Sequence, residues 1–218
     1  MHIEPGYVAP AKVIVANVAA AGVLTYYAKD LLSRPSNIVK TGLAAGFFSL
    51  FMQSFHMTVG PSELHFIGAS AMYLTLGFVP TLLGFALGLL LQGLVFEPGD
   101  LPHLAVNSLS LILPLVAVHY AFGRRLFDRA TGQRISWATI LRLDAAYYAG
   151  VTSMVGFWLL IGEVETPFAA WAAFAGSYLA IVAFEPVFTY LIVKGLKRHE
   201  GSFVVSRFFS VDRLSLAK

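Results

Sequence analysis

The stretch from Phe66 to Phe96 contains no charged residue, and this feature limits the folds open to the chain. The hydrocarbon core of a bilayer is about 30 Å thick and is crossed by roughly 20 helical residues. The stretch is therefore apolar enough for a membrane but too long for one straight crossing. Pro80 interrupts it, and the residue before a proline resists helical geometry. We expect two short helices joined by a tight turn.

Composition indicates a membrane environment for the whole chain. Of its 218 residues, 57% are hydrophobic and 12% are charged, and the mean hydropathy is +0.73. Soluble globular domains carry about 25% charged residues. The absence of cysteine excludes disulfides, thiolate metal sites and cysteine nucleophiles. The sequence predicts an all-α integral membrane protein.

Seven apolar segments have the character of membrane helices. They cover residues 9–28, 38–58, 66–79, 81–96, 104–123, 140–162 and 168–194. We predict a single membrane domain over residues 1–218. Within it, residues 1–8 form an N-terminal segment, residues 9–194 a helical bundle, and residues 195–218 a basic cytoplasmic tail.

The distribution of basic residues predicts how the seven helices are oriented. Cytoplasmic loops of membrane proteins carry an excess of Lys and Arg, and here only Lys12 lies near the opposite side. We expect a multi-pass protein of the cell (inner) membrane with its N-terminus outside and its C-terminus in the cytoplasm. The net charge of +3 then reflects topology, not nucleic-acid binding. The basic residues on the predicted cytoplasmic side are Lys29, Arg34, Lys40, Arg124, Arg125, Arg129, Arg134, Arg142, Lys194, Lys197, Arg198, Arg207, Arg213 and Lys218.

Three pairs of small residues have a spacing that lets helices approach closely. These pairs are Gly42 with Gly46, Ala16 with Ala20, and Gly84 with Gly88. Each pair is a candidate contact, either inside the bundle or with a partner protein.

Four of the six histidines lie at or near the predicted outer face: His2, His56, His65 and His103. A negative surface that also carries imidazoles suits the capture of a divalent transition-metal cation. The topology rule by itself explains the shortage of Lys and Arg on this face, but it does not explain the clustered histidines. The carboxylates that share the face are Glu4, Glu63, Glu97, Asp100, Glu163 and Glu165.

Position 2 has a special chemistry. The α-amine of Met1, the amide nitrogen between residues 1 and 2, and the His2 imidazole can together chelate one Ni²⁺ or Cu²⁺ ion. Three in-plane nitrogens favour square-planar geometry, which one further histidine would complete. The first residues lack the features of a signal peptide, and the bulky second residue disfavours removal of the initiator, so we expect Met1 to be retained. The alternative is that His2 belongs to a frayed terminus without a role.

Four stretches carry a resemblance to a known family. They are "MHIEPG" at residues 1–6, "GPSELHFIGA" at 60–69, "LLLQGLVFEPGDLPHLAVNSL" at 89–109 and "FEP" at 184–186. Together they resemble the CbiM/NikM family, the cobalt- or nickel-specific membrane components of energy-coupling-factor (ECF) transporters, a type of ABC transporter. The resemblance covers most of the chain and implies the same seven-helix fold with an outer N-terminus. It also implies a role in metal ion transport, with cobalamin biosynthesis as one process that uses the imported cobalt.

The resemblance further implies which residues hold the metal. Met1 would supply its amine, His2 its amide nitrogen and imidazole, and His65 the fourth ligand. Asn107 would support the site or pack its loop, and His56 and His103 are additional imidazoles that could extend it. The loop before His65 departs from the family pattern, as does Ser177-Tyr178-Leu179, where the family has a histidine. The Ni²⁺ or Co²⁺ ion is then the transported substrate, and no organic cofactor is expected.

The absence of catalytic motifs bears on the function. The chain contains no Gly-x-x-x-x-Gly-Lys-Ser/Thr loop, no His-Glu-x-x-His and no Gly-x-Ser-x-Gly. We therefore expect a transport subunit that is not an enzyme. The resemblance implies that it works with a transmembrane coupling subunit, cytosolic ATPase subunits and in some cases a small accessory membrane subunit. The alternatives are a stand-alone metal permease or sensor, and a haem-binding redox protein that would use His119.

Two carboxylates fall within predicted helices. Glu185, which precedes Pro186, is costly inside a membrane. It could form a gate, a helix kink or an internal polar contact. Asp144, near the predicted inner boundary, is expected to pair with Arg142 or with another basic residue nearby.

Overall fold

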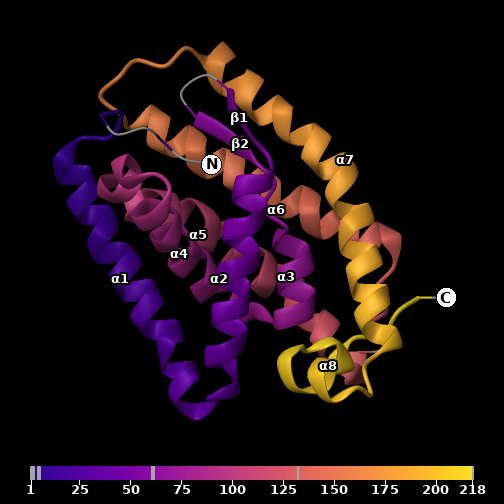
Figure 1. The fold of residues 1–218 in the computed structure, drawn as a ribbon. Coiled ribbons are helices and arrows are strands. Elements are labelled where there is room, and N and C mark those ends of the chain that lie inside the picture. The colour runs from indigo at the N-terminus through magenta and orange to yellow at the C-terminus, as the bar shows by residue number, and fades with distance from the viewer. Residues whose placement is uncertain (1–2, 4–5, 60–61, 132, 218) are drawn as a thin grey trace.

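The computed structural model describes residues 3, 6–59, 62–131 and 133–217. These residues form a helical bundle that carries a short β-hairpin at one end (Figure 1). The helices are α1 (Pro10–Ser33), α2 (Ser36–Ser54), α3 (Ala69–Leu76), α4 (Phe78–Val95), α5 (Leu104–Ala121), α6 (Trp137–Leu160), α7 (Phe168–Arg198) and α8 (Phe203–Phe208). The strands are β1 (His56–Val59) and β2 (Ser62–His65), and η1 (Pro98–His103), η2 (Gly123–Phe127), η3 (Arg129–Thr131) and η4 (Val211–Arg213) are short 3-10 helices.

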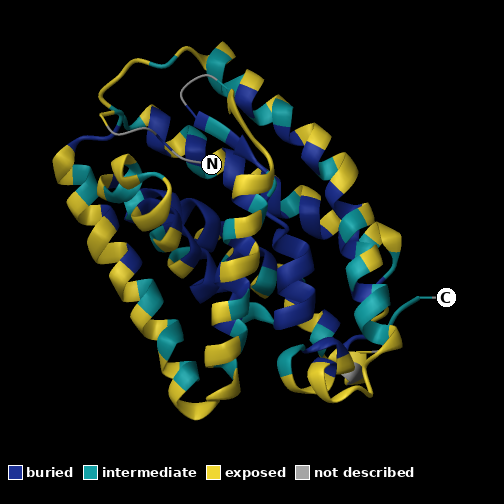
Figure 2. Ribbon diagram, in the orientation of Figure 1, coloured by how far each residue is buried: buried dark blue, intermediate teal, exposed yellow. Residues whose placement is uncertain are grey.

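The bundle has a buried centre and exposed outer faces (Figure 2). All eight residues of α3 are buried, whereas α1 exposes most of its length. Large apolar side chains such as Leu32, Leu160 and Leu179 remain exposed, as expected for helices that face lipid. Four segments are long and apolar enough to cross a membrane: α1, α4, the run Pro98–Ala121 and α7. The predicted all-α membrane fold is confirmed.

The expected break in the charge-free stretch occurs, but at a different residue. The chain turns at Gly77, whose φ of 96° and ψ of 171° separate α3 from α4. Glycine reaches this conformation without the steric strain that a Cβ would cause. Pro80, the expected break, lies in the first turn of α4, where its missing N–H leaves no helical hydrogen bond unmade. The prediction of two helices was right, and the position of the turn was wrong.

The end of the second expected helix was also wrong. Residues 38–58 were expected to be helical, but α2 ends at Ser54, and His56 to Val59 form β1. This strand pairs antiparallel with β2, and His56 stands opposite His65. The sequence explains this: a Gly-Pro dipeptide favours turns, and Thr58 and Val59 are β-branched, which together favour a hairpin over a helix.

The C-terminal segment packs back onto the bundle. Helix α7 continues to Arg198, past its expected end at residue 194. Beyond it, the Ser210 amide donates to the Thr75 carbonyl at 2.7 Å, and Ile135 exchanges backbone hydrogen bonds with the segment 215–217. The predicted basic tail is therefore a packed part of the described structure.

Two of the three small-residue pairs are used inside the bundle. A Cβ on Gly84 would lie 2.4 Å from the Ala44 Cβ, and one on Gly88 would lie 2.5 Å from a Phe48 ring carbon, so these glycines bring α4 against α2. Ala16 and Ala20 are buried in an apolar cluster with Ala105, Val106 and Leu109 of α5. A Cβ added to Gly42 or Gly46 would meet nothing within 4 Å among the described residues.

This contrast gives a stability prediction. Gly84→Leu should lower the free energy of unfolding by about 1–3 kcal/mol, because the new side chain would have to separate α2 from α4. Gly42→Leu, on the open face of α2, is the matched control and should leave stability nearly unchanged. Thermal unfolding in one detergent measures both variants. Equal melting temperatures would contradict the close α2–α4 packing.

Candidate metal centre

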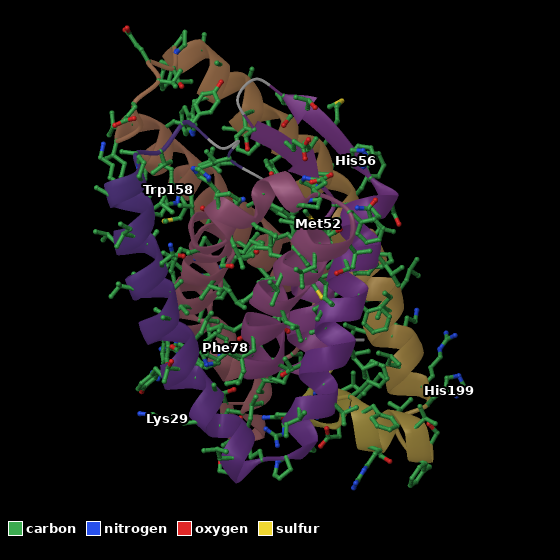
Figure 3. All side chains as sticks on the ribbon, turned by 60° about the vertical axis from the view of Figure 1, so that its left-hand side comes forward. Lys29, Met52, His56, Phe78, Trp158 and His199 are labelled. Atoms are coloured by element: carbon green, nitrogen blue, oxygen red, sulfur yellow. The ribbon has the colours of Figure 1, made fainter. Side chains whose placement is uncertain are left out.

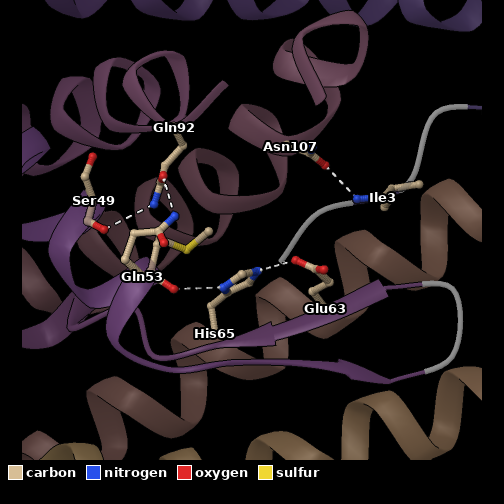
Figure 4. Close-up of polar contacts among 8 residues, drawn as sticks. Ile3, Ser49, Gln53, Glu63, His65, Gln92 and Asn107 are labelled. Atoms are coloured by element: carbon tan, nitrogen blue, oxygen red, sulfur yellow. Dashed lines mark hydrogen bonds and ion pairs between the residues drawn. The ribbon is translucent and has the colours of Figure 1, made fainter. Parts of the chain in front are cut away.

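His65 ends strand β2 and is held by contacts on both sides of its ring (Figure 4). Its Nε2 lies 3.0 Å from Glu63 Oε2, and its Nδ1 lies 3.4 Å from the carbonyl oxygen of Met52 at the end of α2. The residue is buried, with 3% of its surface exposed. Nδ1 therefore faces the end of α2, and Nε2 faces Glu63 on the same strand.

These two contacts constrain the protonation of the ring. A neutral imidazole has one N–H donor and one lone pair, whereas an imidazolium donates from both nitrogens. Both neighbours of His65 are acceptor oxygens, so the neutral ring donates to only one of them. If Nδ1–H donates to Met52, the Nε2 lone pair is available to a metal, with the carbonyl as the orienting partner. A cation at Nε2 would then take the position next to Glu63.

His56 lies beside His65 because the hairpin register places them opposite one another. Their ring centroids are 6.2 Å apart and the rings are inclined by 30°. His56 is exposed, whereas His65 is buried. Figure 3 shows His56 and Met52 at one end of the bundle and Lys29 and His199 at the other. The hairpin imidazole of His56 and the basic side chain of Lys29 thus lie at opposite ends of the bundle.

Ile3 connects the N-terminal segment to this hairpin. Its amide donates a 3.0 Å hydrogen bond to Asn107 Oδ1 on α5, and it forms an antiparallel bridge with Ser62, the first residue of β2. Its side chain is buried against Ala105, Val106 and Trp158. The predicted ligands Met1 and His2 lie outside the described residues. Ile3 is the first residue of the segment that the structure describes.

His103 occupies a separate position at the start of α5. It is buried, and neither ring nitrogen has a hydrogen-bond partner among the described residues. It precedes Asn107 by four residues, about one helical turn. Within the same residues, no group of three or more His, Cys, Asp or Glu side chains has the arrangement of a metal site.

Sequence reasoning missed the residues that support His65. Glu63 was placed among the outer carboxylates, but its contact with His65 was not foreseen. The signal was available, because residues i and i+2 of a strand share a face. Below the hairpin, Gln92 is buried and links α4 to α2: it donates to the Ser49 carbonyl at 3.1 Å and accepts from Gln53 at 3.0 Å. These amides stabilise the end of α2 that supplies the Met52 carbonyl.

The two intramembrane carboxylates lie in the core, outside this centre. Asp144 is fully buried and is not paired with Arg142, whose guanidinium lies over the Phe122 ring at 4.5 Å. The expected ion pair was wrong because Asp144 faces the bundle interior, whereas Arg142 faces the surface. Glu185 is also fully buried and accepts a hydrogen bond from the Tyr148 hydroxyl. Of the three roles considered for Glu185, which were a gate, a helix kink and an internal polar contact, this hydrogen bond corresponds to the internal polar contact.

His119 lies near the end of α5 that is remote from the hairpin. Its ring stacks on Phe78 with centroids 3.8 Å apart, and its Nδ1 lies 2.8 Å from the Tyr73 hydroxyl. A haem would need a second histidine facing it at this depth, and the described residues place aromatic rings there.

Comparison with known proteins gives one family. The profile described as "CbiM: Cobalt uptake substrate-specific transmembrane region" matches residues 2–202. The chain belongs to the CbiM family. The resemblance predicted from the sequence is confirmed, and CbiM proteins are multi-pass membrane components of metal transport.

Two solved structures share this CbiM fold. One, titled "Crystal Structure of an transition metal transporter", has 22% sequence identity and a TM-score of 0.70, with 95% of this chain and 97% of that chain covered. The other, "Crystal Structure of an Truncated Transition metal Transporter", has 23% identity and a TM-score of 0.70, with 91% and 99% covered. Comparison with curated proteins gives no match.

Proposed function

We propose that this chain is the substrate-capture subunit of an ATP-driven importer of Ni²⁺ or Co²⁺, of the energy-coupling-factor type. The proposed ligands are the Met1 amine, the His2 amide nitrogen and imidazole, and the His65 Nε2. The observation that carries the proposal is the position of Ile3, which joins the first residues of the chain to the strand that bears His65.

The direction of the chain at Ile3 supports this ligand set. The bridge between Ile3 and Ser62 is antiparallel, and from this direction we infer that the first two residues would lead from Ser62 toward His65. A strand rises about 3.3 Å per residue, and so about 10 Å separates Ser62 from His65. Two residues and one imidazole side chain are long enough to cover that distance. A longer extension before Ile3 would not be needed.

The chemistry of the surroundings fits a cation with nitrogen ligands. The Met52 carbonyl would orient the His65 ring, as outer hydrogen-bond acceptors commonly do for metal-binding histidines. Glu63 would exchange its contact with Nε2 for an electrostatic contact with the ion. His56, across the hairpin, is a nearby imidazole for the ion's first encounter with the protein. His103, at the start of α5, is not one of the proposed ligands.

The energy for uptake would come from other subunits. The sequence contains no nucleotide-binding loop, and we propose a membrane coupling subunit and cytosolic ATPases as partners, with the basic end of the bundle toward the cytoplasm. The family description names cobalt, whereas a four-nitrogen set with an amidate favours the square-planar geometry of Ni²⁺. Metal competition on the purified protein would decide between the two ions.

The proposal predicts that acid releases the metal. The α-amine and imidazole titrate near pH 7.7–8.0 and 6.5 in reference peptides, and amide ligation displaces a further proton. The Kd for Ni²⁺ should therefore rise at least tenfold for each unit of pH decrease between pH 8 and 6. Calorimetry on protein with a free Met1-His2 terminus measures this slope, and visible absorption reports square-planar Ni²⁺. A Kd that does not change with pH would rule out amine and amide ligands.

A further inference from the structure

The end of the bundle opposite the hairpin contains a polar pocket that the proposed function does not use. It has a volume of about 260 Å³ and lies where the α1–α2 turn, the α3–α4 turn and the C-terminal segment meet. Figure 3 shows Phe78, which lines the pocket, at the same end as Lys29. The charged residues of the lining are Arg34, Lys40, Arg124, Arg213 and Asp30.

The pocket is positively charged and organised by hydrogen bonds. Lys40 reaches into it from α2, half-buried, and donates to the Ser210 hydroxyl at 2.8 Å. Asp30 is engaged by its own neighbours: it accepts from Asn37 at 2.6 Å and pairs with Arg34 at 3.4 Å. Asp212 lies near enough to Lys40 to interact with it. The four cationic side chains of the lining outnumber the two carboxylates, Asp30 and Asp212, so the pocket has an excess of positive charge that would attract an anion.

An apolar groove lies next to the pocket along α1 and α4, two helices that also contribute residues to the pocket. It has a volume of about 500 Å³ and is lined by residues of α1, such as Leu24 and Ala28, by residues of α4, such as Leu83 and Leu87, and by the first turns of α5. On α1 the groove ends at Ala28 and the pocket begins at Asp30. On α4 the pocket ends at Pro80 and the groove begins at Leu83. Figure 1 shows α1 and α2 diverging from their shared turn, with α4 and α5 behind the gap.

The length of the groove matches one leaflet of a bilayer. From Asn17 to Ala28 it follows α1 for about 17 Å at 1.5 Å per residue. Half of a hydrocarbon core of about 30 Å is about 15 Å. The pocket volume lies just below the range of about 300–1,000 Å³ typical of sites for whole small-molecule ligands, so it fits a headgroup and not a complete lipid. A basic pocket between helices on the cytoplasmic side is a recurring form of lipid-headgroup site.

We propose that the pocket and the groove together bind one anionic phospholipid, with its phosphate near Lys40 and Arg213 and an acyl chain along α1 and α4. The phosphate accepts hydrogen bonds from the ammonium and guanidinium groups, and the acyl chain covers the exposed side of the groove. The bound lipid would join α1, which is otherwise only lightly packed, to the C-terminal segment.

The test compares lipids of one chain length by native mass spectrometry of the purified full chain. Phosphatidylglycerol should bind roughly 10- to 30-fold more tightly than phosphatidylcholine, from the contribution of two basic residues. The double substitution Lys40→Gln and Arg213→Gln should remove that preference. The matched control, Lys29→Gln and Arg207→Gln, removes the same charge from positions outside the pocket lining and should retain it. Equal losses in both double variants would reduce the effect to general surface charge and overturn the proposal.

A second pair of variants tests the groove without changing charge. Ala21→Trp fills the groove and should weaken phosphatidylglycerol binding about tenfold, whereas Ala19→Trp, exposed on α1 outside the groove lining, should not. A competition experiment with inorganic phosphate distinguishes a lipid from a soluble ligand. If phosphate competes as well as the lipid does, the pocket is a site for a soluble phosphate and the lipid assignment is wrong. No preference for phosphatidylglycerol over phosphatidylcholine would also overturn the assignment.

Discussion

His65→Ala is expected to weaken Ni²⁺ or Co²⁺ binding by at least about a hundredfold. A four-ligand site that contributes about 10–16 kcal/mol assigns roughly 3 kcal/mol to each ligand, which corresponds to a factor of about 10² in Kd. The Met52 carbonyl and Glu63, which flank the ring in the structure, cannot replace an imidazole nitrogen in a square-planar set. Calorimetry with a free N-terminus measures the loss.

The controls separate ligand loss from general damage to the protein. His199→Ala removes an exposed imidazole at the other end of the molecule and should leave the Kd unchanged. His56→Ala, across the hairpin, should change the Kd by less than threefold if His56 only assists the first encounter. Full affinity in His65→Ala would exclude the proposed ligand set.

A sufficiently long N-terminal extension should weaken metal binding about as much as His65→Ala does. Four residues added before Met1 move the α-amine away from His2, and binding should fall as far as it does in His65→Ala. Inserting a single residue between Met1 and His2 is a different experiment. A histidine in the third position supplies an amine, two amide nitrogens and an imidazole, and this complete chelate would no longer need His65.

The fold could largely be predicted because hydrophobic length is a local property. The seven expected segments correspond to α1–α7, and the charge-free stretch does contain two helices. The turn was misplaced because proline is a visible helix breaker, whereas the sequence does not show which glycine of the charge-free stretch takes a positive φ at the turn. The hairpin was missed because strand pairing depends on a partner segment, and two strands of four residues carry little periodicity of their own.

Some residues of the candidate site could likewise be identified from the sequence, and others could not. His65, His56 and Asn107 could be named from residue type and resemblance, and the structure brings the first two side by side. The Met52 carbonyl could not be named, because a backbone group carries no signal in its residue identity. His103 shares a predicted face with His65, but being on one side of a membrane does not place two residues in contact. Asp144 shows the same limit, since sequence proximity to Arg142 suggested a pair that the helix faces exclude.

Asn107→Leu should weaken metal binding by roughly 10- to 100-fold, although Asn107 is not proposed as a ligand. Its side chain accepts the Ile3 amide hydrogen bond at 3.0 Å, in a buried position on α5. Leucine has a similar volume but no acceptor. The Ile3 amide would lose its partner, and the N-terminal segment would keep the bridge to Ser62 and the apolar packing of the Ile3 side chain but lose its anchor on α5. The loss therefore reflects positioning of the ligands, and the Ni²⁺ absorption spectrum of the saturated variant should match that of the parent protein.

Asn107→Asp is the matched variant because it keeps an acceptor oxygen at the same place. It should retain most of the affinity that Asn107→Leu loses, since either carboxylate oxygen can accept the Ile3 amide. Metal titrations at one pH, followed by the spectrum at saturation, distinguish the two roles. A spectrum that changes in Asn107→Leu would make Asn107 part of the coordination itself. Equal affinity in Asn107→Leu and the parent would show that the Ile3 anchor does not contribute to metal capture.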